Sequence, residues 1–123
     1  MRCTCSMLFV EDSFLLAQSA VLALGDAGLN VHPVPDAQSA LGLFEQRRFD
    51  CAVIDVELPG DMDGIELARR LLQLRPDLPI VLATGYDAAR CGAPAGIPVF
   101  QKPYRFEEIT ASVCPRVLAL AQR

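Results

Sequence analysis

The sequence predicts an α/β fold: a parallel, five-stranded sheet covered by helices on both faces. Short apolar runs alternate along the chain with longer segments in which apolar residues recur at helical spacing. Polar residues follow each central run, as expected where a buried strand ends at the rim of a sheet. The chain has 123 residues and 52% hydrophobic content, enough for a substantial core, and we predict one domain over residues 1–123.

The five predicted strands differ in their apolar character. Three short apolar runs suit the centre of a sheet: residues 6–10, 51–54 and 79–83. Residues 30–34 include Pro33, which lacks a backbone donor and favours an edge position. Residues 99–101 form a last short strand. These features fit the flavodoxin-like strand order 2-1-3-4-5. In sheets of this order, the functional site lies at the carboxyl ends of the strands, next to the first and third strands.

Four helices are predicted, over residues 13–27, 37–48, 64–74 and 105–121. Asp36 can cap the second of these, and Pro115 should kink the last. In the first helix, the residues at helical spacing that we expect to face inward are Phe14, Ala17, Val21 and Leu24. Residues 86–98 are rich in Ala, Gly and Pro, so the helix between the fourth and fifth strands, the fourth of this fold, is predicted to be reduced.

Charge and composition exclude several classes of function. The net charge is −4 and no dense cluster of Lys and Arg occurs, so direct nucleic-acid binding is not expected. No apolar run is long enough to span a membrane or to form the core of a signal peptide, which predicts a cytoplasmic protein with no membrane contact. The five cysteines are odd in number and lie in apolar settings, as structural thiols do.

Polar side chains follow four of the predicted strands. Glu11 and Asp12 follow the first, Asp55 the third, Thr84 the fourth and Lys102 the fifth. Three carboxylates so close together would repel one another, and Mg²⁺ is a suitable counter-ion because it binds carboxylates, waters and a phosphate oxygen. A hydroxyl and an ammonium could bind the other oxygens of a phosphoryl group. The pattern therefore predicts a carboxylate that carries phosphate, with its charge shared between Mg²⁺ and lysine.

This arrangement resembles the receiver domain of two-component response regulators, over essentially the whole chain. The residues that carry the resemblance are, in chain order, Glu11-Asp12, Asp55, Pro59, Asp63-Gly64, Thr84-Gly85 and Lys102-Pro103. The resemblance implies that Asp55 is the phosphoacceptor. It also implies that Asp12, Asp55 and the backbone carbonyl of Glu57 hold Mg²⁺, with Glu11 assisting through a water.

The same resemblance implies roles for residues after the later strands. Thr84 would be the switch hydroxyl, Lys102 the phosphate-binding amine, and Pro103 a candidate for a cis peptide bond. Glu57 and Tyr86 would flank the line of attack on the phosphoryl group and modulate dephosphorylation, with the Glu57 side chain at the mouth of the site.

The output side of the chain departs from the family pattern. The family often has an aromatic residue three positions before the lysine, where this chain has Val99. Alternation along a strand then places Phe100 on the other side. Because valine has no ring to move, we expect activation to act mainly on the loops around the site.

The resemblance also implies partners. The phosphodonor would be a sensor histidine kinase or a histidine phosphotransfer protein, and the signal would pass on through contact with a further protein that the sequence does not name. We expect no dedicated enzyme activity beyond self-phosphorylation from a phosphodonor and auto-dephosphorylation. We expect no effector domain after residue 123, and the natural-looking Met1 favours a stand-alone receiver over one excised from a larger protein.

Three alternatives stay open at this point. The spacing of Asp55, Glu57, Gly60 and Glu66 matches positions of a calcium-binding EF-hand loop, although Pro59 and the preceding strand do not fit. A phosphatase of the haloacid dehalogenase type also uses an aspartate nucleophile, but its acidic pair follows the nucleophile in the chain. The third is a receiver-like module that no longer takes phosphate, which the presence of Asp55, Thr84 and Lys102 argues against.

Overall fold

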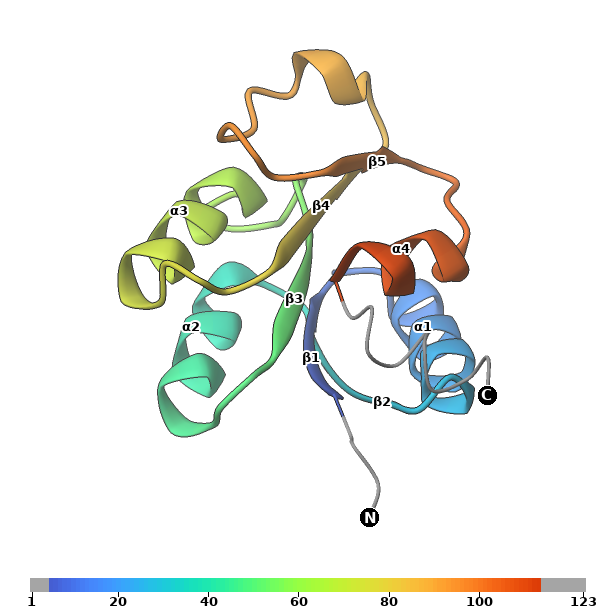
Figure 1. Ribbon diagram of the computed structural model, residues 1–123. Coiled ribbons are helices and arrows are strands. Elements are labelled where there is room, and N and C mark those ends of the chain that lie inside the picture. Colours follow the sequence, from blue (N-terminus) through green and yellow to red (C-terminus); the bar gives the residue numbers. More distant parts are fainter. Residues whose placement is uncertain (1–4, 114–123) are drawn as a thin grey trace.

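The computed structural model describes residues 5–113 and contains one parallel sheet in the order β2-β1-β3-β4-β5 (Figure 1). The strands are β1 (Cys5–Val10), β2 (Leu29–Val34), β3 (Cys51–Asp55), β4 (Ile80–Thr84) and β5 (Val99–Gln101). This confirms the predicted architecture and strand order. The strands β1, β3 and β4 are almost wholly buried, whereas β2, which contains Pro33, lies at one edge.

Helices cover both faces of the sheet, with α1 and α4 on one face and α2 and α3 on the other (Figure 1). Their bounds are α1 (Phe14–Asp26), α2 (Ala37–Gln46), α3 (Gly64–Leu74) and α4 (Phe106–Val113). Pro115 and the predicted end of the last helix lie outside the described residues. None of the helices within residues 5–113 has the length and apolar character needed to cross a bilayer.

Side-chain caps explain where three of these helices begin. Ser13, Asp36 and Asp63 each accept a hydrogen bond from the backbone amide three residues later. Each bond satisfies an amide that has no partner within the helix. The capping role predicted for Asp36 is therefore confirmed, and Asp63 fixes the start of α3 beside the end of β3.

The core is divided by the sheet into two apolar clusters, and β5 contributes to both. Val99 packs with the cluster under α2 and α3, whereas Phe100 packs with the cluster under α1 and α4. This confirms that the two side chains point to opposite faces. Between β4 and β5, the only helical element is η1 (Ala88–Arg90), one short 3-10 turn, as the composition of this segment predicted.

One prediction about the core is wrong. Phe14 was expected to face inward, but its side chain is 73% exposed. The buried residues of α1 are Ala17, Ala20 and Leu24. Helix α1 begins just after the rim of the sheet, so its first turn has no strand beneath it to cover Phe14. The two alanines allow the rest of the helix to lie close to the sheet.

Candidate functional site

The predicted site residues meet at the carboxyl ends of the strands. Val10 and Ile54 are register partners in the neighbouring strands β1 and β3, so Glu11 and Asp55, the next residues, lie side by side. Asp55 and Thr84 are the last residues of β3 and β4. The backbone amide of Lys102 donates to the carbonyl of Thr84 at 2.8 Å, which holds the end of β5 against β4. The peptide bond between Lys102 and Pro103 is cis.

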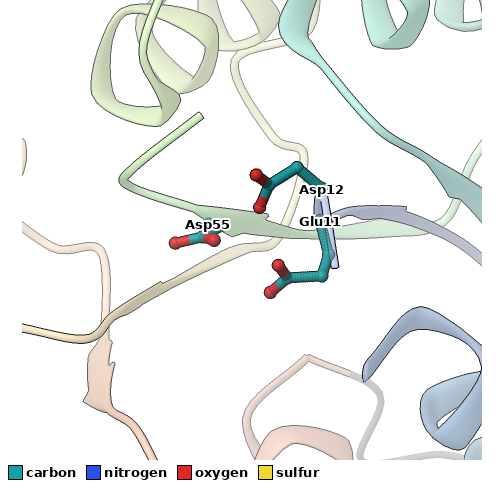
Figure 2. Close-up of side chains that lie close together, drawn as sticks. All are labelled: Glu11, Asp12 and Asp55. Carbon is teal, nitrogen blue, oxygen red and sulfur yellow. The ribbon is translucent and has the colours of Figure 1, made fainter. Parts of the chain in front are cut away.

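Three carboxylates form an acidic cluster at this rim. One oxygen from each of Glu11, Asp12 and Asp55 lies within 4.8 Å of the others. Figure 2 shows the three carboxylate groups turned toward a common space, two from the chain after β1 and one from the end of β3. Glu11 and Asp55 are 5% and 4% exposed, whereas Asp12 is open to solvent. This oxygen-rich cluster could hold a metal ion.

Lys102 neutralises part of this buried charge. Its Nζ donates to Glu11 Oε1 at 2.8 Å and to Asp55 Oδ2 at 3.0 Å. The other oxygens of the two carboxylates accept from backbone amides, Glu11 Oε2 from Ser13 at 3.0 Å and Asp55 Oδ1 from Glu57 at 3.2 Å. Because both carboxylates are paired and hydrogen-bonded, they can be buried in the folded protein.

The pKa values reflect the balance between burial and pairing. Burial raises the pKa of Asp55 to about 6 and the nearby charge of Glu11 adds to the rise, although the hydrogen bond from Lys102 opposes it. Burial lowers the pKa of Lys102, but its hydrogen bonds to Glu11 and Asp55 outweigh that effect and hold the pKa above its usual value. At neutral pH, the site therefore contains an ionised Asp55 whose negative charge is only partly compensated.

A second set of hydrogen bonds lies at the end of β4. Thr84, which is fully buried, donates from Oγ1 to Glu57 Oε2 at 2.6 Å, and the amide of Gly85 donates to Glu57 Oε1 at 2.9 Å. The amide of Tyr86 donates to Thr84 Oγ1 at 3.1 Å. The sequence predicted the Glu57 side chain at the mouth of the site but not these contacts with Thr84 and Gly85. The parallel pairing of β3 with β4 was the signal that could have indicated them.

Gly64 allows α3 to begin directly against the end of β3. A Cβ atom at this position would lie 1.9 Å from the carbonyl oxygen of Asp55. The amide of Gly64 donates to the carbonyl of Val56 at 2.9 Å, which holds the helix start in place. The Asp63-Gly64 pair thus places α3 close to the site, with Asp63 as the cap and Gly64 as the point of closest approach.

The match to a known family covers nearly all of the described residues. The model of the response regulator receiver domain matches residues 7–113. The chain belongs to this family. A receiver domain is the phosphoacceptor signalling module of two-component systems, and receiver domains of response regulators accept phosphate from histidine kinases.

Individual relatives agree with this assignment. The receiver domain is 36% identical to the two-component response regulator PhoP of Pseudomonas aeruginosa, over 95% of this chain and 52% of that protein. It is 31% identical to the response regulator receiver protein CpdR of Brucella abortus, over 92% of this chain and 97% of that protein. The chain thus spans about half the length of PhoP and nearly all of CpdR.

A solved structure gives the same fold. A response regulator receiver protein from Sinorhizobium medicae superposes with a TM-score of 0.83 at 25% identity, covering 94% of this receiver domain and 96% of that chain. The calcium-loop and phosphatase alternatives are not favoured. A strand, β3, precedes Asp55 where an EF-hand requires a helix, and the similar proteins are response regulators.

Proposed function

We propose that Asp55 is the residue of this receiver domain that takes the phosphoryl group. The observation that carries the proposal is the position of its carboxylate: 4% exposed, 3.0 Å from the Lys102 ammonium, and in one cluster with two further carboxylates. An Asp55 oxygen attacks the phosphorus of a phosphohistidine, the N–P bond breaks as the O–P bond forms, and the electron pair returns to the imidazole nitrogen. The product is an acyl phosphate on Asp55.

Magnesium is the ion that we propose for the acidic cluster. The donor set fits Mg²⁺ because it consists of carboxylate oxygens with one side, at Asp12, open for water and a phosphoryl oxygen. Asp12, Asp55 and the backbone carbonyl of Glu57 would hold the ion, with Glu11 acting through a water. Bound there, it would supply positive charge to the phosphoryl oxygens.

Other residues of the site would bind and protect the phosphoryl group. Lys102 would move its hydrogen bonds from the carboxylates to a phosphoryl oxygen, and Thr84 would donate to another. Tyr86 follows Thr84 by two residues and is 72% exposed, and we propose that its ring flanks the path of an attacking water and so prolongs the lifetime of the acyl phosphate.

The proposed partners rest on the receiver family to which the chain belongs. We propose a sensor histidine kinase or a histidine phosphotransfer protein as phosphodonor, and output through contact with another protein. A cytoplasmic location and the absence of direct nucleic-acid binding remain predictions from the sequence.

The test of this function is treatment with acetyl phosphate and Mg²⁺, followed by intact mass measurement. We expect the wild type to gain one phosphoryl group that is stable in acid and labile in base, with acetate as the leaving group. The Asp55→Asn variant should gain none. Asp61→Asn is a matched control, because Asp61 is an exposed carboxylate of the same loop, and this variant should be modified like the wild type. Equal modification of the Asp55→Asn variant would contradict the assignment.

The metal proposal predicts a distinct effect for Asp12→Asn. Because Asp12 is exposed and supplies one of few protein ligands, its loss should weaken Mg²⁺ binding by about tenfold or more without unfolding the chain. Calorimetric titration with MgCl₂ measures the affinity directly, with Asp61→Asn again as the control. An unchanged affinity in the Asp12→Asn variant would place the ion elsewhere.

A further inference from the structure

Glu57 holds two hydrogen-bond donors at the end of β4, one of which is the Thr84 hydroxyl that we propose for the phosphoryl group. Each of its carboxylate oxygens accepts from a different donor at the end of β4, one from the Thr84 hydroxyl and one from the Gly85 amide. A hydroxyl beside a backbone amide is a suitable pair of donors for an anion with several oxygens. In this structure, the anion that they bind is a carboxylate of the chain itself.

We propose that Glu57 is an internal competitor for the phosphoryl group, a positioning residue that keeps Thr84 and Gly85 occupied until phosphate is transferred. This inference rests on the proposed function of Asp55 and concerns the regulation of the same site. Glu57 must release both donors before a phosphoryl oxygen on Asp55 can accept from them. Its side chain therefore slows phosphoryl acceptance.

The valence of the Thr84 hydroxyl makes the competition exclusive. A hydroxyl has one hydrogen to donate, and Thr84 gives it to Glu57 at 2.6 Å. The oxygen of the same hydroxyl already accepts from the Tyr86 amide at 3.1 Å. Thr84 is fully buried, so water does not supply a second partner. A carboxylate and a phosphoryl group would also repel each other if both lay at these donors.

The position of Glu57 in the chain makes it suited to this role. Its backbone amide donates to Asp55 Oδ1 at 3.2 Å, so the same residue contacts the phosphoacceptor through its main chain and the switch hydroxyl through its side chain. Glu57 is partly exposed, which leaves its carboxylate a path to solvent once it is released. Within residues 5–113, it forms no ion pair that would hold it at the end of β4.

The experiment compares rates of phosphorylation by acetyl phosphate at saturating Mg²⁺. Glu57→Ala should be phosphorylated about tenfold faster than the wild type. In this variant Thr84 and Gly85 are free to bind the phosphoryl group without first losing their hydrogen bonds to a charged carboxylate. Glu57→Gln should show a smaller increase, since its amide keeps one acceptor for Thr84 but loses charge. Glu45→Ala, which removes an exposed glutamate from α2, controls for the change in net charge and should match the wild type.

Two further measurements separate competition from a general structural effect. In a Thr84→Ala background, the effect of Glu57→Ala should fall to about twofold, because one of the two contacts is already absent. The Gly85 amide resonance should also shift in the Glu57→Ala variant without any phosphodonor. If the wild type is phosphorylated and Glu57→Ala reacts at the same rate or more slowly, the competition inference is wrong while the proposed function stands. If the wild type itself takes no phosphate, the proposed function fails.

Discussion

Replacing Gly64 by alanine is expected to lower the free energy of unfolding by about 3 kcal/mol. The new Cβ would lie 1.9 Å from the carbonyl oxygen of Asp55 and 2.9 Å from the Cα of Val56. Both are backbone atoms in a buried part of the chain, so they cannot turn aside as a flexible side chain would. Helix α3 must instead move away from β3, and its buried residues Leu67, Ala68 and Leu71 lose packing.

Gly42→Ala is the matched control for this prediction. Gly42 lies in α2, and a Cβ atom there would meet nothing within 4 Å. Because alanine favours a helix more than glycine does, the free energy of unfolding of this variant should rise by about 0.5–1 kcal/mol. Urea unfolding of the two variants and the wild type measures both effects. A Gly64→Ala variant as stable as the wild type would show that α3 can shift at no cost.

The second large effect is a pH-dependent gain in stability from Asp55→Asn in metal-free buffer. The pKa of Asp55 is about 6 in the folded protein, against an ordinary value of 3.8. At a pH below the ordinary pKa of 3.8, the Asp55 carboxyl group is protonated in both the folded and the unfolded state, and its contribution to stability is fully present. As the pH rises from there to above 6, the unfolded chain ionises more readily than the folded one, so the wild type loses stability.

A shift of this size corresponds to a loss of about 3 kcal/mol, since one pKa unit is worth about 1.4 kcal/mol. Asparagine does not ionise. The free energy of unfolding of the Asp55→Asn variant, relative to that of the wild type, should therefore rise by about this amount between pH ~4 and pH ~7. The pKa of Lys102 is raised, so this side chain stays charged over the whole range. Its effect on the difference in free energy of unfolding between the two proteins therefore does not change with pH. Urea unfolding of both proteins at several pH values gives the comparison. A difference that does not change with pH would rule out a raised pKa for Asp55.

Mg²⁺ provides an independent check on the same measurement. An ion that binds only the folded wild type should restore part of the stability that the wild type lacks at neutral pH. The Asp55→Asn variant has one carboxylate fewer and should respond less.

The strand order and the position of the site could be predicted from the sequence because both depend on short-range patterns. Apolar runs identify the central strands, and the residues that follow them must lie at one rim of a parallel sheet. For that reason, Glu11, Asp12 and Asp55 were expected to converge, and the structure brings them together. The opposite directions of Val99 and Phe100 follow from the two-residue period of a strand.

The contacts that the sequence did not predict depend on distances across the fold. The position of Phe14 in the helical pattern suggested burial, but exposure depends on where α1 begins relative to the edge of the sheet. The Glu57 side chain has several rotatable bonds, and only the structure shows that it turns toward Thr84. The contact of Lys102 with Glu11, in addition to Asp55, also requires the geometry of three strand ends.

The positions of the two tyrosines have a consequence for spectroscopy. The chain has no tryptophan, so its intrinsic near-ultraviolet fluorescence comes chiefly from Tyr86 and Tyr104. Tyr104 packs edge to face against Phe106, its side chain is partly buried, and this burial raises its pKa to about 12. Tyr86 is 72% exposed, and its amide is bonded to the Thr84 hydroxyl. A quencher dissolved in water therefore acts mainly on the exposed Tyr86 ring, which gives this protein a native optical probe without any attached dye.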